Sequence, residues 1–95
     1  MAENHPEEFY QRLKEQLLEN GQWPANYLYK FIVPTDEAKV DEIRKIFDMP
    51  GAVIESKQSK KGTYTSVSIT VRMVNPDEVI KKYKAVSHIE GVISL

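Results

Sequence analysis

The sequence contains no cysteine, only two histidines and no long run of apolar residues. The missing cysteine excludes a disulfide scaffold, a thiolate zinc site and a cysteine nucleophile. No stretch reaches the roughly 18 consecutive apolar residues that indicate a transmembrane helix. The formal net charge of −1 also lacks the strong basic excess that is typical of nucleic-acid-binding domains. We therefore expect a soluble protein without thiol chemistry and without membrane association.

The composition is that of one folded domain. Of the 95 residues, 41% are hydrophobic and 28% are charged, which is close to the values of ordinary globular proteins. A chain of this length supports a single modest core. The acidic residues Glu3, Glu7 and Glu8 occupy the region where a secretory signal carries basic and then apolar residues. We therefore expect a cytoplasmic location.

The charged residues are divided unevenly along the chain. Residues 1–48 hold ten acidic and six basic side chains, whereas residues 49–95 hold four acidic and seven basic ones. Such asymmetry is typical of a surface that attracts a charged partner, although helices and turns also carry charge simply for solvation. The basic residues of the second half gather in two groups, Lys57, Lys60 and Lys61, and Lys81, Lys82 and Lys84.

The first part of the chain has the spacing of an amphipathic helix. Phe9, Leu13 and Leu17 recur at intervals of four residues, which predicts a helix over residues 9–20 after a mobile tail over residues 1–8. A helix this short persists only when it packs on another part of the protein. We therefore expect it to dock on the following domain.

Three later segments have the pattern of β-strands. Residues 27–33 and 66–73 alternate apolar or aromatic residues with polar ones, and residues 52–58 form a weaker strand. The segment 59–62 joins the last two of these strands as a hairpin turn. In that turn, Gly62 stands where the backbone requires a positive φ.

Two further helices and a final strand complete the predicted elements. One helix follows Pro34 and is capped by Thr35 or Asp36. The other begins at Asn75–Pro76, with an N-cap residue followed by proline at the first helical position. Residues 92–95 form a short last strand. The apolar stripes of the two helices consist of Val40, Ile43, Ile46 and Phe47, and of Val79, Ile80, Tyr83 and Val86.

This order of elements predicts an α+β fold of the ferredoxin-like type, β-α-β-β-α-β, preceded by an extra N-terminal helix. Two right-handed crossovers place the first and third strands at the centre of a four-stranded antiparallel sheet, with both helices on one face. Residues 1–25 comprise the acidic tail, amphipathic helix and connector, and residues 26–95 comprise the ferredoxin-like domain. The other face of the sheet should carry Leu28, Ile32, Ser66, Ser68, Thr70 and Arg72.

No group of residues predicts catalysis or cofactor binding. The loop that follows the first strand contains Asp36, which would repel phosphate, and lacks glycine and arginine. His88 lies at the end of the last predicted helix, where a positively charged side chain interacts well with the helix dipole, and has no evident catalytic partner. The open face of the third strand has no aromatic residue for stacking RNA bases. We predict no catalytic residue, no metal site and no cofactor.

The hairpin has more functional groups than a turn requires. Between Ser59 and Thr70 the chain places two lysines, a glycine, a tyrosine and a row of hydroxyl groups. We predict that this hairpin contacts a partner through Lys60, Lys61, Gly62, Tyr64, Ser66 and Ser68.

The same run carries a resemblance to a known family. Together with Tyr29–Lys30, the pattern Ser-x-x-Gly-x-Tyr-x-Ser-Val-Ser resembles the YbeD-like family of small bacterial proteins, a domain of unknown function (number 493). The resemblance covers roughly residues 26–95. It implies a ferredoxin-like fold similar to ACT-type regulatory domains, and it implies no established activity or cofactor. The matching residues are Ser59, Gly62, Tyr64, Ser66, Val67 and Ser68.

We therefore expect a small, non-enzymatic interaction or regulatory domain. Its partner is an unidentified protein, and weak association with a second copy is compatible with the open face. An ACT-type sensor of a small ligand is the alternative, although Pro34–Asp36 replaces the glycine-containing turn that such sensors tend to use. A nucleic-acid-binding module is the third and least favoured hypothesis.

Overall fold

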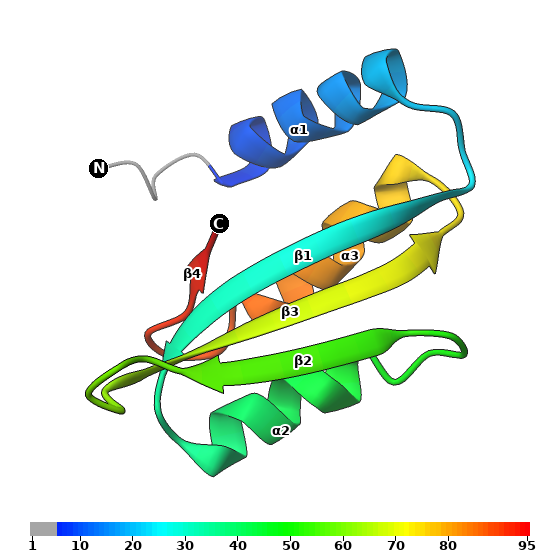
Figure 1. Ribbon diagram of the computed structural model, residues 1–95. Helices are drawn as coiled ribbons and strands as arrows, with labels where there is room; N and C mark the ends of the chain where they lie inside the picture. Colours follow the sequence, from blue (N-terminus) through cyan, green and yellow to red (C-terminus); the bar gives the residue numbers. More distant parts are fainter. Residues whose placement is uncertain (1–5) are drawn as a thin grey trace.

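A computed structural model describes residues 6–95 as three helices and four strands (Figure 1). In chain order these elements are α1 (Pro6–Asn20), β1 (Ala25–Pro34), α2 (Glu37–Ile46), β2 (Val53–Gln58), β3 (Tyr64–Met73), α3 (Pro76–Val86) and β4 (Ile93–Ser94).

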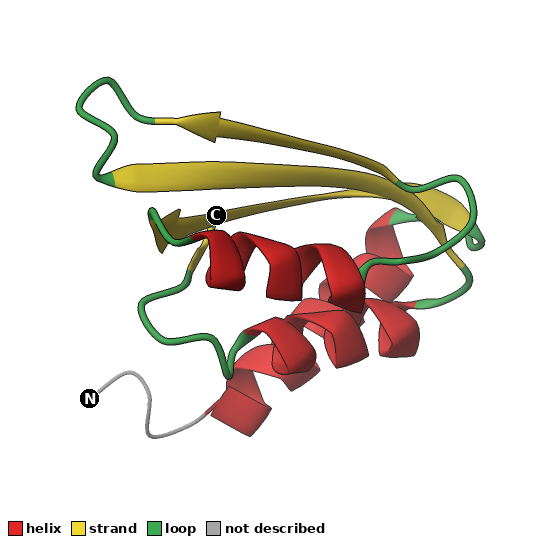
Figure 2. Cartoon of the chain, turned by 90° about the horizontal axis from the view of Figure 1, so that it is seen from below, coloured by secondary structure: helices red, strands yellow, loops and turns green. Residues whose placement is uncertain are grey.

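The four strands form one antiparallel sheet in the order β2-β3-β1-β4, so β1 and β3 occupy its centre. All three helices lie on one side of this sheet, and the opposite side is uncovered (Figure 2). The predicted ferredoxin-like topology is therefore confirmed. We call the uncovered side of the sheet the open face.

The core lies between the sheet and the helices, and β1 and β3 supply much of it. Successive side chains of a strand face opposite sides, so alternate residues of each strand point towards the helices. In β1, Tyr29 is completely buried, and its hydroxyl donates a hydrogen bond of 3.1 Å to the carbonyl of Val79 in α3. The predicted core faces are confirmed. The buried apolar residues are Tyr29, Phe31, Val33, Ile43, Phe47, Val67, Ile69, Val71, Met73, Val79, Ile80, Val86 and Ile89.

Helix α1 docks on the rest of the protein, as its apolar stripe predicts. Leu17 and Trp23 are partly buried against the core, and the indole N–H of Trp23 donates a hydrogen bond of 3.1 Å to the carbonyl of Leu17. Phe9, at the other end of the stripe, remains 56% exposed. The stripe is therefore covered best at its C-terminal end. The division of the chain into residues 1–25 and 26–95 stays a prediction.

The N-caps of α2 and α3 are those that the sequence predicts. The Asp36 carboxylate accepts a hydrogen bond of 2.9 Å from the backbone N–H of Ala38, and the Asn75 side chain accepts one of 2.9 Å from the N–H of Glu78. Each bond satisfies an N–H that has no partner within the helix. Of the two cap candidates for α2, the structure therefore uses Asp36.

Helix α1 begins earlier than the apolar spacing predicts. It begins at Pro6 instead of residue 9, and its first turn contains the acidic residues Glu7 and Glu8. Proline and acidic side chains both suit the first turn of a helix, but they leave no apolar signal there. The remainder of the predicted tail, residues 1–5, lies outside the described residues.

Strand β4 is shorter than the predicted strand over residues 92–95, and contains only Ile93 and Ser94. The backbone N–H of Val92 donates to the carbonyl of Ile89 at 3.2 Å, so this residue still belongs to the preceding turn. The strand therefore pairs with a small part of β1 only, at Phe31 and Ile32.

The turn before β4 generates a prediction about two glycines. Gly91 and Gly62 have similar positive φ values of 81° and 77°. A Cβ atom at Gly91 would lie 2.9 Å from Cγ of Pro34, whereas one at Gly62 would have only the flexible Gln58 side chain, at 3.7 Å. We predict that Gly62→Ala lowers the free energy of unfolding by about 1 kcal/mol and Gly91→Ala by about 3 kcal/mol, because only the second adds a clash to the backbone strain. Urea denaturation measures both, and equal losses would contradict the close approach.

Candidate functional site

Ser59 organises the hairpin between β2 and β3. Its backbone N–H donates to the carbonyl of Tyr64 at 2.7 Å, and its hydroxyl accepts from the N–H of Tyr64 at 3.1 Å. The carbonyl of Ser59 accepts from the N–H of Gly62 at 2.9 Å. These hydrogen bonds close the predicted turn and hold its backbone in one conformation, which orients its side chains.

A shallow cleft of about 420 Å³ opens beside this hairpin. We call it the hairpin cleft. It brings together part of the predicted partner-binding set with side chains of β1 and β2. Of the candidate residues, Lys60, Tyr64 and Ser66 line the cleft, whereas Lys61, Gly62 and Ser68 lie outside its lining.

Sequence reasoning did not place the rest of the cleft lining in the site. Lys57 lies opposite Ser66 in the β2–β3 pairing, and Ser66 lies opposite Ile32 in the β1–β3 pairing. Counting the hairpin register from the turn would have identified Lys57. The lining residues outside the predicted set are Ile32, Lys57, Gln58 and Ser59.

The open face carries more apolar surface than the sequence predicts. Leu28 is 63% exposed, as expected for that side of β1. Val53 and Ile93 are also exposed, at 57% and 51%, and the register places them on the same face. Val53 pairs with Thr70, which in turn pairs with Leu28, and Ile93 pairs with Ile32. Apolar side chains therefore reach this face from β1, β2 and β4.

The charged residues of the open face are mostly basic. Register places Lys30, Lys57 and Arg72 on it, together with one acidic residue, Glu55. Within residues 6–95, none of these four side chains takes part in an ion pair shorter than 4.0 Å. The basic groups of the face are therefore available to an acidic partner.

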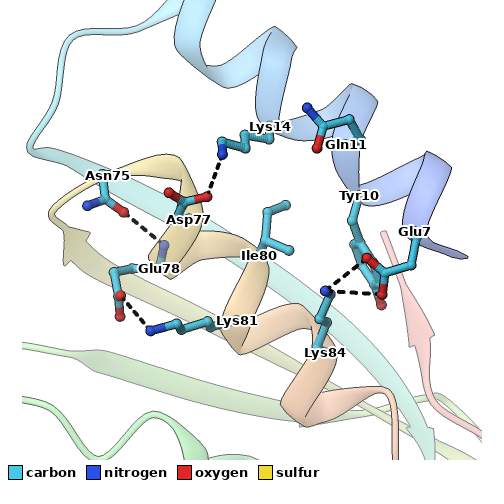
Figure 3. A pocket seen from close by; sticks show the side chains of 10 residues that line it. All are labelled: Glu7, Tyr10, Gln11, Lys14, Asn75, Asp77, Glu78, Ile80, Lys81 and Lys84. Atoms are coloured by element: carbon cyan, nitrogen blue, oxygen red, sulfur yellow. Dashed lines mark hydrogen bonds and ion pairs between the residues drawn. The ribbon is translucent and has the colours of Figure 1, made fainter.

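The three ion pairs of residues 6–95 lie instead on the helical side, all of them around a pocket of about 430 Å³ between α1 and α3 (Figure 3). Lys14 pairs with Asp77 at 2.8 Å, and Lys84 pairs with Glu7 at 3.2 Å. The Lys84 ammonium also lies 5.3 Å from the centre of the Tyr10 ring. These charges satisfy one another across the two helices, so we interpret the pocket as the seam that holds α1, and call it the α1–α3 seam.

Tyr29 and Tyr83, which form an aromatic cluster with Tyr27, are the only groups in residues 6–95 whose pKa is strongly raised. The hydroxyls of Tyr27 and Tyr83 lie 2.9 Å apart. Burial raises the pKa of Tyr29 well above its ordinary value, and the neighbouring Tyr83 and Tyr27 raise it further. Burial, with the hydrogen bond to Tyr27, likewise raises the pKa of Tyr83. The phenols of Tyr29 and Tyr83 are therefore neutral, hydrogen-bonded parts of the structure.

We next consider metal-binding groups and His88 in the described part of the chain. Residues 6–95 contain no cluster of three or more side chains placed to hold a metal ion. His88 is exposed and follows the end of α3. No helix among these residues is long and apolar enough to cross a membrane.

The protein is a small ferredoxin-like α+β domain. Its most distinctive surface is the open face of the sheet. A family model described as "Protein of unknown function (DUF493)" matches residues 19–95. The chain therefore belongs to the DUF493 family, and the resemblance that the hairpin motif indicates is confirmed. The match begins within the last turn of α1, so most of that helix lies outside it.

Individual relatives agree with this assignment. A UPF0250 protein of Haemophilus influenzae is 33% identical over 86 residues, which cover 87% of this chain and 89% of the relative. One of Yersinia pestis is 30% identical over 83 residues, covering 84% of this chain and 95% of the relative. The solution structure of protein HP0495 from H. pylori is similar with a TM-score of 0.64 at 20% identity, covering 80% of this chain and 86% of that one. The structural similarity supports the fold.

The tyrosine cluster generates a prediction about alkaline stability. Above pH 10.0, unfolded tyrosines lose protons that Tyr29 and Tyr83 keep in the folded state, so stability is complete below that pH and falls as the pH rises. Each residue should contribute a slope of up to about 1.4 kcal/mol per pH unit. We predict that Tyr29→Phe and Tyr83→Phe each reduce the slope, measured by urea denaturation between about pH 9 and 11. An unchanged slope in both variants would show that neither phenol is protected.

Proposed function

We propose that this protein is a small, non-enzymatic interaction domain that binds a partner protein with the open face of its sheet. The observation that carries the proposal is the exposure of apolar side chains on that face. Leu28, Val53 and Ile93 are each more than half exposed, although they belong to a sheet whose other side carries the buried core. Exposed apolar side chains that gather on one surface and are bordered by polar residues are typical of a binding site.

The charges of the open face indicate the chemistry of the partner. Lys30, Lys57 and Arg72 share the face with the apolar residues and have no ion-pair partner among residues 6–95, and Glu55 is the one acidic residue that β1, β2 and β3 place there. A basic surface with apolar anchors fits a protein surface that combines acidic rim residues with apolar ones. The lack of cysteine fits a reducing compartment such as the cytoplasm.

The alternative of a small-ligand sensor has less support. In the loop between β1 and α2, the carboxylate of Asp36 is used as the N-cap, and the Thr35 hydroxyl lies 2.9 Å from that of Thr65. These polar groups are therefore occupied within the protein. Nucleic-acid binding is less favoured still, because bases need aromatic side chains on which to stack. Within β1, β2 and β3, Tyr64 is the only aromatic side chain on the open face, and it lies at the end of the sheet.

Charge reversal in the hairpin cleft tests the proposal. We predict that Lys57→Glu combined with Lys60→Glu reduces recovery of the partner from native cells at least about tenfold, because an acidic surface is then repelled. The matched control combines Lys39→Glu with Lys45→Glu on α2, which changes the net charge equally on the helical side. Recovery is measured by quantitative mass spectrometry of proteins cross-linked to the tagged full chain.

Three outcomes would overturn the proposal. The first is equal loss of partners in both double variants, and the second is a nuclease-sensitive interaction with steep salt dependence, which would indicate nucleic acid. The third is a rise in melting temperature with an amino acid and no protein partner, which would indicate a ligand sensor. Lys45, Lys57 and Lys60 are exposed, Lys39 is half-buried, and none of the four takes part in an ion pair within residues 6–95, so circular dichroism should show an intact fold.

The open face also generates a prediction about self-association. Ile32 and Ile93 are neighbours in the register, but with Leu28 and Val53 they form a small apolar area compared with the roughly 1,200 Å² of stable interfaces. We predict a monomer at micromolar concentration and only weak dimers above it, which Ile32→Lys weakens further. Sedimentation equilibrium measures the association. A tight dimer, or a weak one that is indifferent to Ile32→Lys, would contradict this interpretation.

A further inference from the structure

One edge of β1 is only partly paired. On one side, all ten residues of β1 pair with β3, from Ala25 opposite Met73 to Pro34 opposite Tyr64. On the other side, β4 pairs only with Phe31 and Ile32. The part of β1 that precedes Lys30 therefore has no strand beside it within the described residues.

The main-chain groups along this edge can be assigned. The N–H of Leu95 donates to the carbonyl of Lys30 at 2.9 Å, so Lys30 presents its main-chain groups to the β4 side. Residues two and four positions earlier face the same way in a strand. Asn26 and Leu28 therefore present two N–H and two C=O groups to the β4 side. No backbone hydrogen bond from residues 6–95 reaches them there.

Beneath this edge lies an apolar groove of about 430 Å³, which we call the edge groove. Helix α1 runs beside β1 on the side away from β3 (Figure 1) and belongs to the helical layer (Figure 2). The helical layer thus extends beyond the last full strand of the sheet. The lining of the groove includes Phe9 and Leu13 of α1, Tyr27 of β1, Tyr83 of α3, and Val92 and Leu95.

The unpaired groups and the groove together define the shape of an occupant. A strand added in line with β4 would pair with Asn26 and Leu28, and every second side chain would point down to Phe9 and Leu13. Its other side chains would lie on the open face, beside Leu28. On that face Lys30 lies two residues from Leu28, and Arg72 lies opposite Asn26. The inward positions of the occupant therefore favour apolar residues, and the outward positions favour acidic ones.

A second copy of this chain fits the edge less well. Pairing two β1 edges would bring the helices of the second copy to the place that α1 already occupies. The unpaired stretch from Ala25 to Tyr29 is also only about 17 Å long at 3.4 Å per residue. Such a short edge provides too little area for the interface of a stable dimer, but it suits one extended peptide.

We propose that the edge of β1 at Asn26 and Leu28 binds an extended segment of another protein as an added β-strand, with apolar residues towards the edge groove and acidic residues on the open face. Main-chain pairing supplies the contact, and the alternate side chains supply the specificity. The site lies outside the hairpin cleft and shares only Leu28, Lys30 and Arg72 with the open face. Its main-chain pairing at the edge of β1 goes beyond the proposed function and does not depend on it.

A designed peptide tests the proposal with the full chain. The probe is a capped seven-residue peptide that alternates glutamate and valine, and the readout is amide hydrogen exchange followed by NMR. Without peptide, the amides of Asn26 and Leu28 should exchange fast, whereas those of Tyr27 and Tyr29 face β3 and should be protected. Adding the peptide should slow the exchange of Asn26 and Leu28 at least about tenfold.

Two matched controls isolate the main-chain contact. A peptide of the same sequence with N-methyl groups on the edge-facing amides should bind at least about tenfold more weakly, because it lacks the donors. In the protein, Leu28→Pro removes one N–H that β3 does not use, and proline is tolerated at a strand edge. It should weaken binding at least about tenfold, whereas Leu28→Ala, which keeps the N–H, should weaken it less than about threefold.

Several outcomes would overturn the proposal. Equal binding of the methylated and unmethylated peptides would show that the edge is not used, and this result does not depend on the folding of Leu28→Pro. Protection of Asn26 and Leu28 that rises with protein concentration, without peptide, would assign the edge to a second copy. Lys57→Glu combined with Lys60→Glu should leave peptide binding unchanged, which separates this test from that of the open-face partner.

Discussion

The pairing of β1 with β3 is the constraint on which the other elements depend. Ten residues of each strand face one another in a single register, and the alternate residues on the helical side form the centre of the core. A slip of β1 by one residue against β3 would turn Tyr29 and Phe31 towards solvent and bring Leu28 and Lys30 inward. β2 pairs only with β3, and β4 only with β1, so both outer strands take their positions from this central pair. The same register decides which side chains reach the open face.

Most of the fold could be predicted because its signals are local. The alternation in β1 and β3, the caps at Asp36 and Asn75, and the turn at Gly62 each depend on residues within a few positions of one another. The errors have local causes too. The first turn of α1 has helix-starting residues but no apolar one. The last strand is short because the N–H of Val92 is used in the preceding turn, a bond that no sequence pattern indicates.

The candidate surfaces were harder to predict, because they combine residues from separate strands. Lys60, Tyr64 and Ser66 could be found, since they follow one another in the hairpin. Ile93 and Ile32 become neighbours only through the β1–β4 register. Val53 was missed because β2 is polar on both faces, so its alternation does not distinguish an outer side from an inner one. The unpaired edge of β1 depends on the length of β4, which the sequence overestimates.

The α1–α3 seam makes α1 a unit whose local stability responds to dissolved ions. Two ion pairs, Lys84–Glu7 and Lys14–Asp77, hold the N-terminal part of α1, and their acidic side chains are 81% and 63% exposed. Exposed ion pairs weaken with salt, because the screening length falls from about 8 Å at physiological ionic strength to about 3 Å at 1 M. The C-terminal end of α1 is held by the packing of Leu17 and Trp23, which salt does not weaken. Rising salt therefore weakens the attachment of the N-terminal part of α1, which carries the Phe9 wall of the edge groove, more than that of its C-terminal end.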